Sequence, residues 1–207
     1  GVGKTTIARI FAKSLNCAEG VGSIPCGVCA SCLEIDRGSM IDLIEVDAAS
    51  RTKVEETRQL LDNVQYAPTR SRFKIYLIDE VHMFSKHSFN ALLKTLEEPP
   101  PHVKFLLATT DPDKLPVTVL SRCLKFGLKK VEPEVIVHQL ELILKDEKIP
   151  FDSDSVNYLA GASDGSVRDA LSLLDQAIVH GKGQLVAKEI GKMLGLAQRE
   201  TILKILE

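Results

Sequence analysis

The sequence predicts an α/β protein with a doubly wound parallel sheet over residues 1–131, followed by a small helical domain over 132–195. Three observations predict this arrangement. A glycine-containing segment opens the chain directly before a helix, strand patterns then alternate with helix patterns, and only helix patterns follow Glu132-Pro133-Glu134. The chain has 207 residues, 44% of them hydrophobic and 26% charged, which is ordinary for a globular protein.

The first element is a phosphate-binding loop. It consists of Gly1, Val2, Gly3, Lys4, Thr5 and Thr6, and the helix expected after it covers about 6–14. The glycines let backbone N–H groups approach a phosphate, Lys4 reaches the β- and γ-phosphates, and Thr5 holds Mg²⁺. The complete pattern has another glycine five residues before Gly3 and a buried strand before that. We expect both to precede the residues in this sequence, so that the first strand is missing from its numbering.

A second segment supports the reading of the loop. Residues 73–80 form an apolar run that ends in Asp79 and Glu80, as expected for a central parallel strand whose carboxyl end faces a ligand. Asp79 is expected to help hold Mg²⁺, and Glu80 to act as the general base on the attacking water. His82 is interpreted as a structural residue. Together with the loop, this segment predicts ATP hydrolysis.

The remaining elements fit the same fold. Further strands are expected at 41–47 and 103–109, and helices at 52–66 and 85–97. The first of these helices opens with a capping-box pattern, Thr52-x-x-Glu55, and the second is stopped by prolines 99–101. The helical domain is expected to contain helices near 133–147, 153–161, 167–180 and 186–195. Ser166 is the predicted N-cap of the third, with Asp169 three residues later.

Four cysteines stand close together in an expected insertion over 17–32. They are Cys17, Cys26, Cys29 and Cys32, in a loop that contains glycine and proline. Four thiolates suit a tetrahedral Zn²⁺ ion, and a closed structural site is expected. A redox CxxC pair and an iron–sulfur cluster are the alternatives.

Charge and hydropathy exclude several classes of function. The formal net charge is −2, so a nucleic-acid partner would have to bind a local basic patch. No apolar run approaches the roughly 18 residues of a membrane span, and no export signal opens the chain. We expect a cytoplasmic protein that does not contact a membrane.

The motifs taken together resemble a known family over essentially the whole chain. They are GVGKTT, the four-cysteine insertion, LIDEVHM, FLLATTDPDKLPVTVLSRC and GSVRDALSLLDQA. The chain resembles the gamma/tau subunits of bacterial DNA polymerase III, the AAA+ ATPases that drive the sliding-clamp loader. The resemblance implies an AAA+ P-loop fold with a zinc-binding insertion and a helical lid, and it implies ATP, Mg²⁺ and Zn²⁺ as cofactors.

The resemblance also implies roles for residues outside the two central motifs. Thr110, or its neighbour Thr109, would sense the γ-phosphate, and Arg168 would touch nucleotide from the lid of the same subunit. Arg122 would be an arginine finger that completes the site of the adjacent subunit, which ties hydrolysis to assembly.

The partners implied are the delta and delta-prime subunits, other gamma/tau copies, the sliding clamp and primed DNA. The positions that would contact the DNA backbone are Arg51, Lys53, Arg58, Ser85 and Lys94. Residues 196–207 would begin the collar domain that drives assembly.

Two other functions remain open at this point. A non-hydrolysing scaffold subunit such as delta-prime shares the cysteine insertion and the Ser121-Arg122-Cys123 sequence, although the intact Lys4, Asp79 and Glu80 argue against it. Another AAA+ DNA motor, such as a branch-migration helicase, would lack the cysteine insertion.

Overall fold

The computed structural model describes residues 1–50 and 60–195. They form two compact units. One unit comprises the described residues of Lys4–Phe126, and the other comprises Gly1–Gly3 together with residues 127–195.

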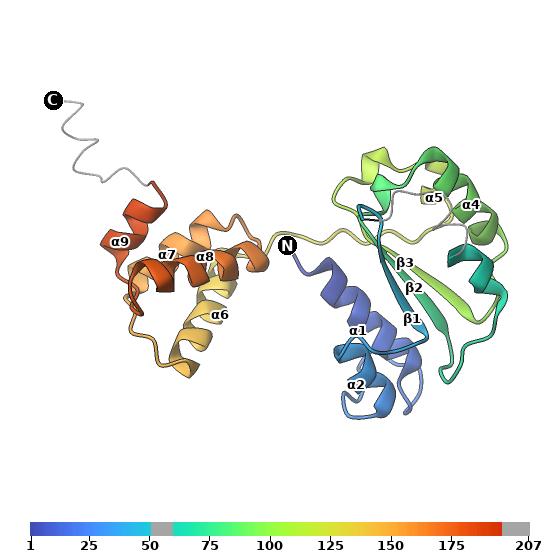
Figure 1. Ribbon diagram of the computed structural model, residues 1–207, viewed down its shortest axis with the longest axis horizontal. Coiled ribbons are helices and arrows are strands. Elements are labelled where there is room, and N and C mark those ends of the chain that lie inside the picture. The colour runs from blue at the N-terminus through green and yellow to red at the C-terminus, as the bar shows by residue number, and fades with distance from the viewer. Residues whose placement is uncertain (51–59, 196–207) are drawn as a thin grey trace. The chain divides into compact units, whose positions relative to one another are not determined.

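The Lys4–Phe126 unit is an α/β structure (Figure 1). Its helices and strands are α1 (Lys4–Asn16), α2 (Ala30–Asp36), β1 (Leu43–Asp47), β2 (Lys74–Asp79), α4 (Lys86–Glu97), β3 (Val103–Leu107) and α5 (Val117–Leu120). Short 3-10 helices lie at η1 (Asn63–Gln65), η2 (Val81–Met83) and η3 (Pro112–Lys114).

The described strands form a parallel sheet in the order β1-β2-β3. Asp47 pairs with Asp79, and Ile78 pairs with Leu107, so the carboxyl ends of all three strands lie at one edge. The parallel strands predicted at 41–47, 73–80 and 103–109 are therefore confirmed, each shorter by two residues.

Both faces of β2 are buried. Ile75 and Leu77 pack into a cluster with Ala12 of α1 and Ile35 of α2, whereas the alternate residues of the strand join the cluster that contains Leu92 of α4. Because successive side chains of a strand point to opposite faces, helices cover the sheet on both sides. This is the doubly wound arrangement that the sequence predicts.

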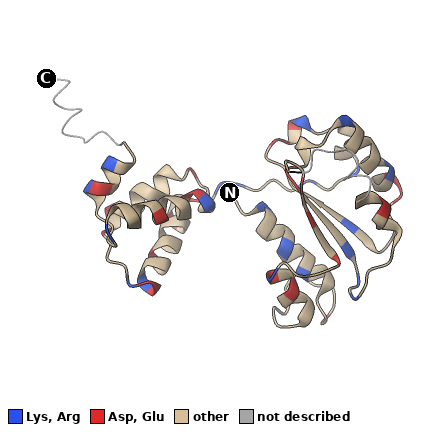
Figure 2. Ribbon diagram, viewed as in Figure 1, with Lys and Arg blue, Asp and Glu red and all other residues tan. Residues whose placement is uncertain are grey.

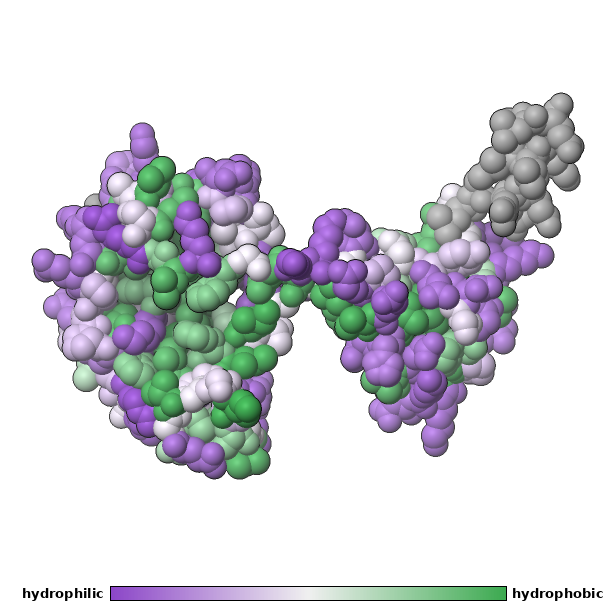
Figure 3. Space-filling model, turned by 180° about the vertical axis from the view of Figure 1, so that it is seen from behind, coloured by the Kyte–Doolittle hydropathy of each residue, from purple (hydrophilic) through white to green (hydrophobic). Residues whose placement is uncertain are grey.

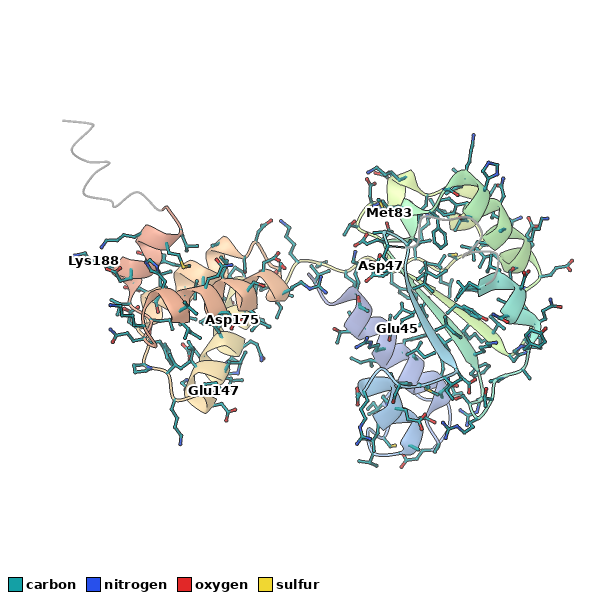
Figure 4. All side chains as sticks on the ribbon, viewed as in Figure 1. Glu45, Asp47, Met83, Glu147, Asp175 and Lys188 are labelled. Atoms are coloured by element: carbon teal, nitrogen blue, oxygen red, sulfur yellow. The ribbon has the colours of Figure 1, made fainter. Side chains whose placement is uncertain are left out.

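Side-chain hydrogen bonds fix α1 against the sheet. Asn16, at the end of α1, donates to the carbonyl oxygen of Phe73 and accepts from its amide, both at 2.9 Å. Arg9 donates two hydrogen bonds to Glu45 of β1, at 2.7 and 2.6 Å. Glu45 is labelled in Figure 4. These contacts fix the position of α1 relative to β1 and β2.

Among the described residues, α2 and α5 have no counterpart among the predicted helices. The capping box at Thr52 and Glu55 and most of the helix expected at 52–66 lie outside the described residues. Helix α2 contains Cys32 and lies in the cysteine insertion, whose glycine- and proline-containing sequence indicates a loop. The helix predicted at 85–97 begins one residue later, because Ser85 is its N-cap and its hydroxyl accepts from the Ser88 amide.

The helices of the second unit are α6 (Pro133–Asp146), α7 (Ser153–Ala162), α8 (Val167–His180) and α9 (Ala187–Met193). They bury a common apolar cluster that includes Leu140, Leu159 and Leu174. Ser166 caps α8 by accepting from the Asp169 amide, which confirms the predicted cap. Gly165 has φ +76°, and a β-carbon there would lie 2.6 Å from that of Lys130, so glycine is required before this cap.

Among the described residues, no helix combines the length and apolar character needed to span a bilayer. Acidic and basic side chains are interspersed over both units (Figure 2). Hydrophobic side chains are exposed on the α/β unit (Figure 3), among them Ile7, Ile10 and Phe11 of α1.

Candidate active site and cysteine cluster

The candidate active site lies at the carboxyl edge of the sheet. Lys4 and Thr5 open α1, Asp79 ends β2, and Glu80 follows it directly. Asp47 and Met83, both labelled in Figure 4, mark this edge at the end of β1 and in η2. The carboxyl edge of a parallel sheet is where ligands bind in open α/β folds.

The phosphate-loop residues and the acidic residues are in direct contact. Lys4 Nζ lies 2.9 Å from Glu80 Oε1, and Thr5 Oγ1 donates to Asp79 Oδ2 at 2.9 Å. A hydroxyl and a carboxylate oxygen at this spacing are hard donors of the kind that Mg²⁺ prefers. The donor set therefore fits the predicted magnesium ligands.

The second oxygen of Glu80 is bound to the segment that follows β3. Oε2 accepts from the Thr110 amide at 3.1 Å and from the Thr110 hydroxyl at 2.8 Å. Burial alone would raise the pKa of Glu80, but the hydrogen bonds from Lys4 and Thr110 outweigh it and hold that pKa below its ordinary value. Glu80 is therefore charged at neutral pH in this arrangement.

His82 joins the same network, which the sequence analysis did not foresee. Its Nδ1 lies 2.9 Å from Thr109 Oγ1 and 3.3 Å from Glu80 Oε2. The only sequence signal was its position two residues after Glu80, and spacing alone did not show that the ring turns back toward the carboxylate.

Glu80 also has an unusual backbone conformation. Its φ of 46° and ψ of 43° place it in the left-handed region, which costs a non-glycine residue about 1–3 kcal/mol. Such a conformation persists when surrounding contacts hold it, and here the side chain is held at both oxygens.

The first three residues of the loop belong to the helical unit, together with Arg168. Gly3 has φ +86°, and Gly1 donates a hydrogen bond to Ser166 Oγ. Arg168 packs against Gly1, where an added β-carbon would lie 3.1 Å from its Cβ. Thus Arg168 adjoins the first glycine of the loop. Val2 is half-buried, and Thr6 is exposed in the first turn of α1.

Arg122 is placed apart from the Lys4–Glu80 contact. Its guanidinium donates to Glu97 of α4 at 2.9 Å and to the Thr118 carbonyl oxygen at 2.8 Å. Its side chain keeps 35% of its accessible surface. The arginine is thus ion-paired within its own unit and still partly accessible.

The four predicted metal ligands come together. The sulfur atoms of Cys17, Cys26, Cys29 and Cys32 all lie within 4.8 Å of one another. Four sulfurs at about 2.3 Å from a tetrahedral Zn²⁺ would be roughly 3.8 Å apart, so the set fits the ion after a small contraction. Cys17 follows α1 and Cys32 lies in α2, so such an ion would join the two helices.

Backbone amides tune the thiols of this cluster. Amide donors, first that of Cys26, lower the pKa of Cys17, and those of Ala18 and Cys32 lower the pKa of Cys29 to about 6. Burial raises the pKa of Cys32 to about 12. Amide donors of this kind stabilise thiolates, which are the form that binds a metal.

Of the predicted DNA contacts, Ser85 and Lys94 are described, at the start and in the last turn of α4. Arg51, Lys53 and Arg58 lie outside the described residues.

Comparison with known proteins identifies two matching family models. One, described as "DNA polymerase III, delta subunit", matches residues 1–132. The other, "DNA polymerase III clamp loader subunit, ATPase lid domain", matches residues 135–183.

Curated relatives match the full chain. DNA polymerase III subunit tau of Escherichia coli and that of Salmonella typhimurium are each 63% identical over 207 residues, which is 100% of this chain and 32% of each relative. DNA polymerase III subunit gamma of Buchnera aphidicola (from Acyrthosiphon pisum) is 57% identical over 95% of this chain and 54% of its own length. The chain thus spans about a third of the length of the tau subunits that it matches.

Among solved structures, the RuvB Holliday junction branch migration motor of Thermotoga maritima is similar, with a TM-score of 0.60 and 16% identity over 94% of this chain and 68% of that chain. A RuvB variant from the same organism has a TM-score of 0.62 and 15% identity over the same shares. At this identity the likeness concerns the fold alone, an AAA+ P-loop sheet with a helical lid.

Proposed function

The chain belongs to the gamma/tau family of DNA polymerase III clamp loader subunits, and on that premise we propose that it binds and hydrolyses ATP as a motor subunit of the loader. The loader would open the sliding clamp and place it on primed DNA. Its partners would be the delta and delta-prime subunits, further gamma/tau copies, the clamp and the DNA.

The observation that carries this proposal is the contact between the phosphate loop and the acidic end of β2. Lys4 and Thr5 each touch one carboxylate of the Asp79-Glu80 pair at 2.9 Å. A scaffold subunit that does not hydrolyse ATP needs no such arrangement, so the geometry favours a motor.

Each residue then has a task in hydrolysis. Lys4 binds the β- and γ-phosphates, and Thr5 with Asp79 holds the Mg²⁺ that neutralises phosphate charge when bound. Glu80 takes a proton from the attacking water, whose oxygen bonds to the terminal phosphorus as the bond to the ADP oxygen breaks. Thr110 or Thr109 senses the terminal phosphate.

The remaining assignments follow the family. Residues 1–131 would be the nucleotide-binding domain, 132–195 the lid and 196–207 the start of a collar. Arg168 would touch nucleotide from the lid, and Arg122 would act on the site of an adjacent subunit. Ser85 and Lys94 remain candidates for contact with the DNA backbone. They are about 13 Å apart along α4, within reach of neighbouring phosphates.

We also propose that the cysteine cluster holds a structural Zn²⁺. All four sulfurs would be ligands, which leaves no open position for catalysis. The ion would tie the end of α1 to the start of α2 and so brace the helix that carries the phosphate loop.

Glu80→Gln in the full-length protein tests the enzymatic assignment. The variant should bind ATP with similar affinity, because the amide still fits the site, yet lose about 10²- to 10⁴-fold in turnover. Phosphate release gives turnover, and a fluorescent ATP analogue gives affinity.

Glu134→Gln is the matched control, because Glu134 is exposed on α6 of the helical unit. Unchanged turnover in Glu80→Gln would refute the general base. Adding clamp and primed DNA separates the loader from other AAA+ motors, since only a loader should be strongly stimulated by both together.

A further inference from the structure

The contacts of Glu80 divide between its two oxygens. Oε2 accepts two hydrogen bonds from Thr110 and lies 3.3 Å from His82 Nδ1. Oε1 is bound by Lys4 Nζ alone among the contacts of the described residues. Thr110 follows β3 and His82 lies in η2, whereas Lys4 belongs to the phosphate loop.

Other contacts fix the His82 ring in its position beside Glu80 Oε2. Its side chain keeps 10% of its accessible surface, and Nδ1 faces Thr109 Oγ1 at 2.9 Å. Thr109 Oγ1 in turn accepts from the Asp111 amide at 3.0 Å. The amide of Val81 donates to the Ala108 carbonyl oxygen at 3.0 Å, so backbone and side-chain contacts join η2 to the segment after β3.

The residue that these contacts surround, Glu80, has a strained backbone. Glu80 lies in the left-handed region, and its side chain would sample other directions if the surroundings did not hold it. Thr110 donates two hydrogen bonds to Oε2, and His82 Nδ1 lies 3.3 Å from the same oxygen, so neither contact involves Lys4. The contact with Lys4, in contrast, competes with the phosphates that Lys4 is proposed to bind.

We infer that Oε2 anchors Glu80 while Oε1 is the working oxygen, and that His82 is the positioning residue that keeps this orientation. The inference rests on the proposed ATPase function. When ATP draws Lys4 to its phosphates, Oε1 is released and accepts the proton of the attacking water, while Oε2 stays fixed. Without His82 the released carboxylate turns away from the water.

Substitutions at His82 in the full-length loader complex test this inference. An asparagine amide occupies the place of Nδ1, whereas a glutamine amide occupies the place of Nε2. His82→Ala and His82→Gln should therefore lose about 10- to 100-fold in kcat, the scale expected when a catalytic group is misplaced by about 1 Å. His82→Asn should stay within about 3-fold of the parent, a ratio far below that scale. ATP affinity should be unchanged in all three.

Two further variants distinguish an effect of His82 on the position of Glu80 from an effect on folding. Thr109→Val removes the other partner of Nδ1 and should lower kcat similarly, and its combination with His82→Ala should cost little more than either alone. His138→Ala, at an exposed histidine of α6, should leave kcat unchanged. If His82→Ala fails to fold, the comparison of the asparagine and glutamine variants still decides.

Equal kcat in the asparagine and glutamine variants, or a normal kcat in His82→Ala, would overturn the inference. Other results would contradict the proposed ATPase function itself. If the parent complex hydrolyses no ATP, or Glu80→Gln retains turnover, the enzymatic assignment fails before His82 is considered. A loss in Glu80→Gln together with normal His82→Ala would refute only the role of His82.

Discussion

Replacing Asn16 by alanine should weaken the attachment of α1 to the sheet that carries the acidic residues. The side chain is buried and makes two hydrogen bonds to the backbone of Phe73, both at 2.9 Å. Two neutral hydrogen bonds contribute about 2 kcal/mol net, and the half-buried amide and carbonyl of Phe73 left without partners add about 1–2 kcal/mol. Allowing for partial solvation, the free energy of unfolding of this unit should fall by about 2–4 kcal/mol.

Hydrogen exchange is the suitable assay because it reports the α/β unit separately from the helical one. The amide of Ile75, buried and bonded to the Asp42 carbonyl oxygen at 2.8 Å, reports opening of the sheet. Its protection should fall by about 30- to 1,000-fold. Asn90→Ala, at an exposed position of α4, is the control and should change stability by less than about 0.5 kcal/mol.

Asn16→Asp sharpens the test. One oxygen of the introduced carboxylate would face the Phe73 carbonyl oxygen, and its charge would lie at the negative end of the α1 dipole. The folded-state pKa of the new group should be raised, so its penalty is full above that pKa and disappears as pH falls below the ordinary value near 4. At neutral pH Asn16→Asp should be less stable than Asn16→Ala, and in acid the order should reverse. Equal stability of the two at both pH values, or a loss under about 0.5 kcal/mol in the alanine variant, would refute the reasoning.

Two further predictions concern the metal and the assembly. Reduced protein should carry one zinc ion per chain by elemental analysis. Cys29→Ser should lose most of it, and Cys123→Ser, outside the cluster, should keep it; metal-free parent protein would contradict the zinc assignment. Subunits with Arg122→Ala and subunits with Lys4→Ala should each be nearly inactive alone but recover ATP hydrolysis when mixed, because each supplies what its neighbour lacks. Mixed rings no more active than the separate variants would rule out action on a neighbour.

Local chemistry in the sequence predicted most of the fold. The strand at 73–80 was recognisable because it is buried on both faces and so reads as a continuous apolar run. The cap of α8 was recognisable because Ser166 and Asp169 have the required spacing. Helix α2 was missed because it has only seven residues, includes Cys32 and follows a glycine- and proline-containing stretch, so neither length nor periodicity indicated a helix.

The sequence by itself determined the chemistry of this protein. Glycine, lysine and threonine at the start of α1 and two carboxylates at the end of β2 are local patterns, each legible within a few residues. Only the tertiary structure decided how these groups are held. The two oxygens of Glu80 have different partners, His82 reaches Thr109 across 27 residues, and Arg122 pairs with Glu97 across 25. Such contacts depend on the directions of side chains after strands and turns have packed, and no periodicity along the chain records those directions.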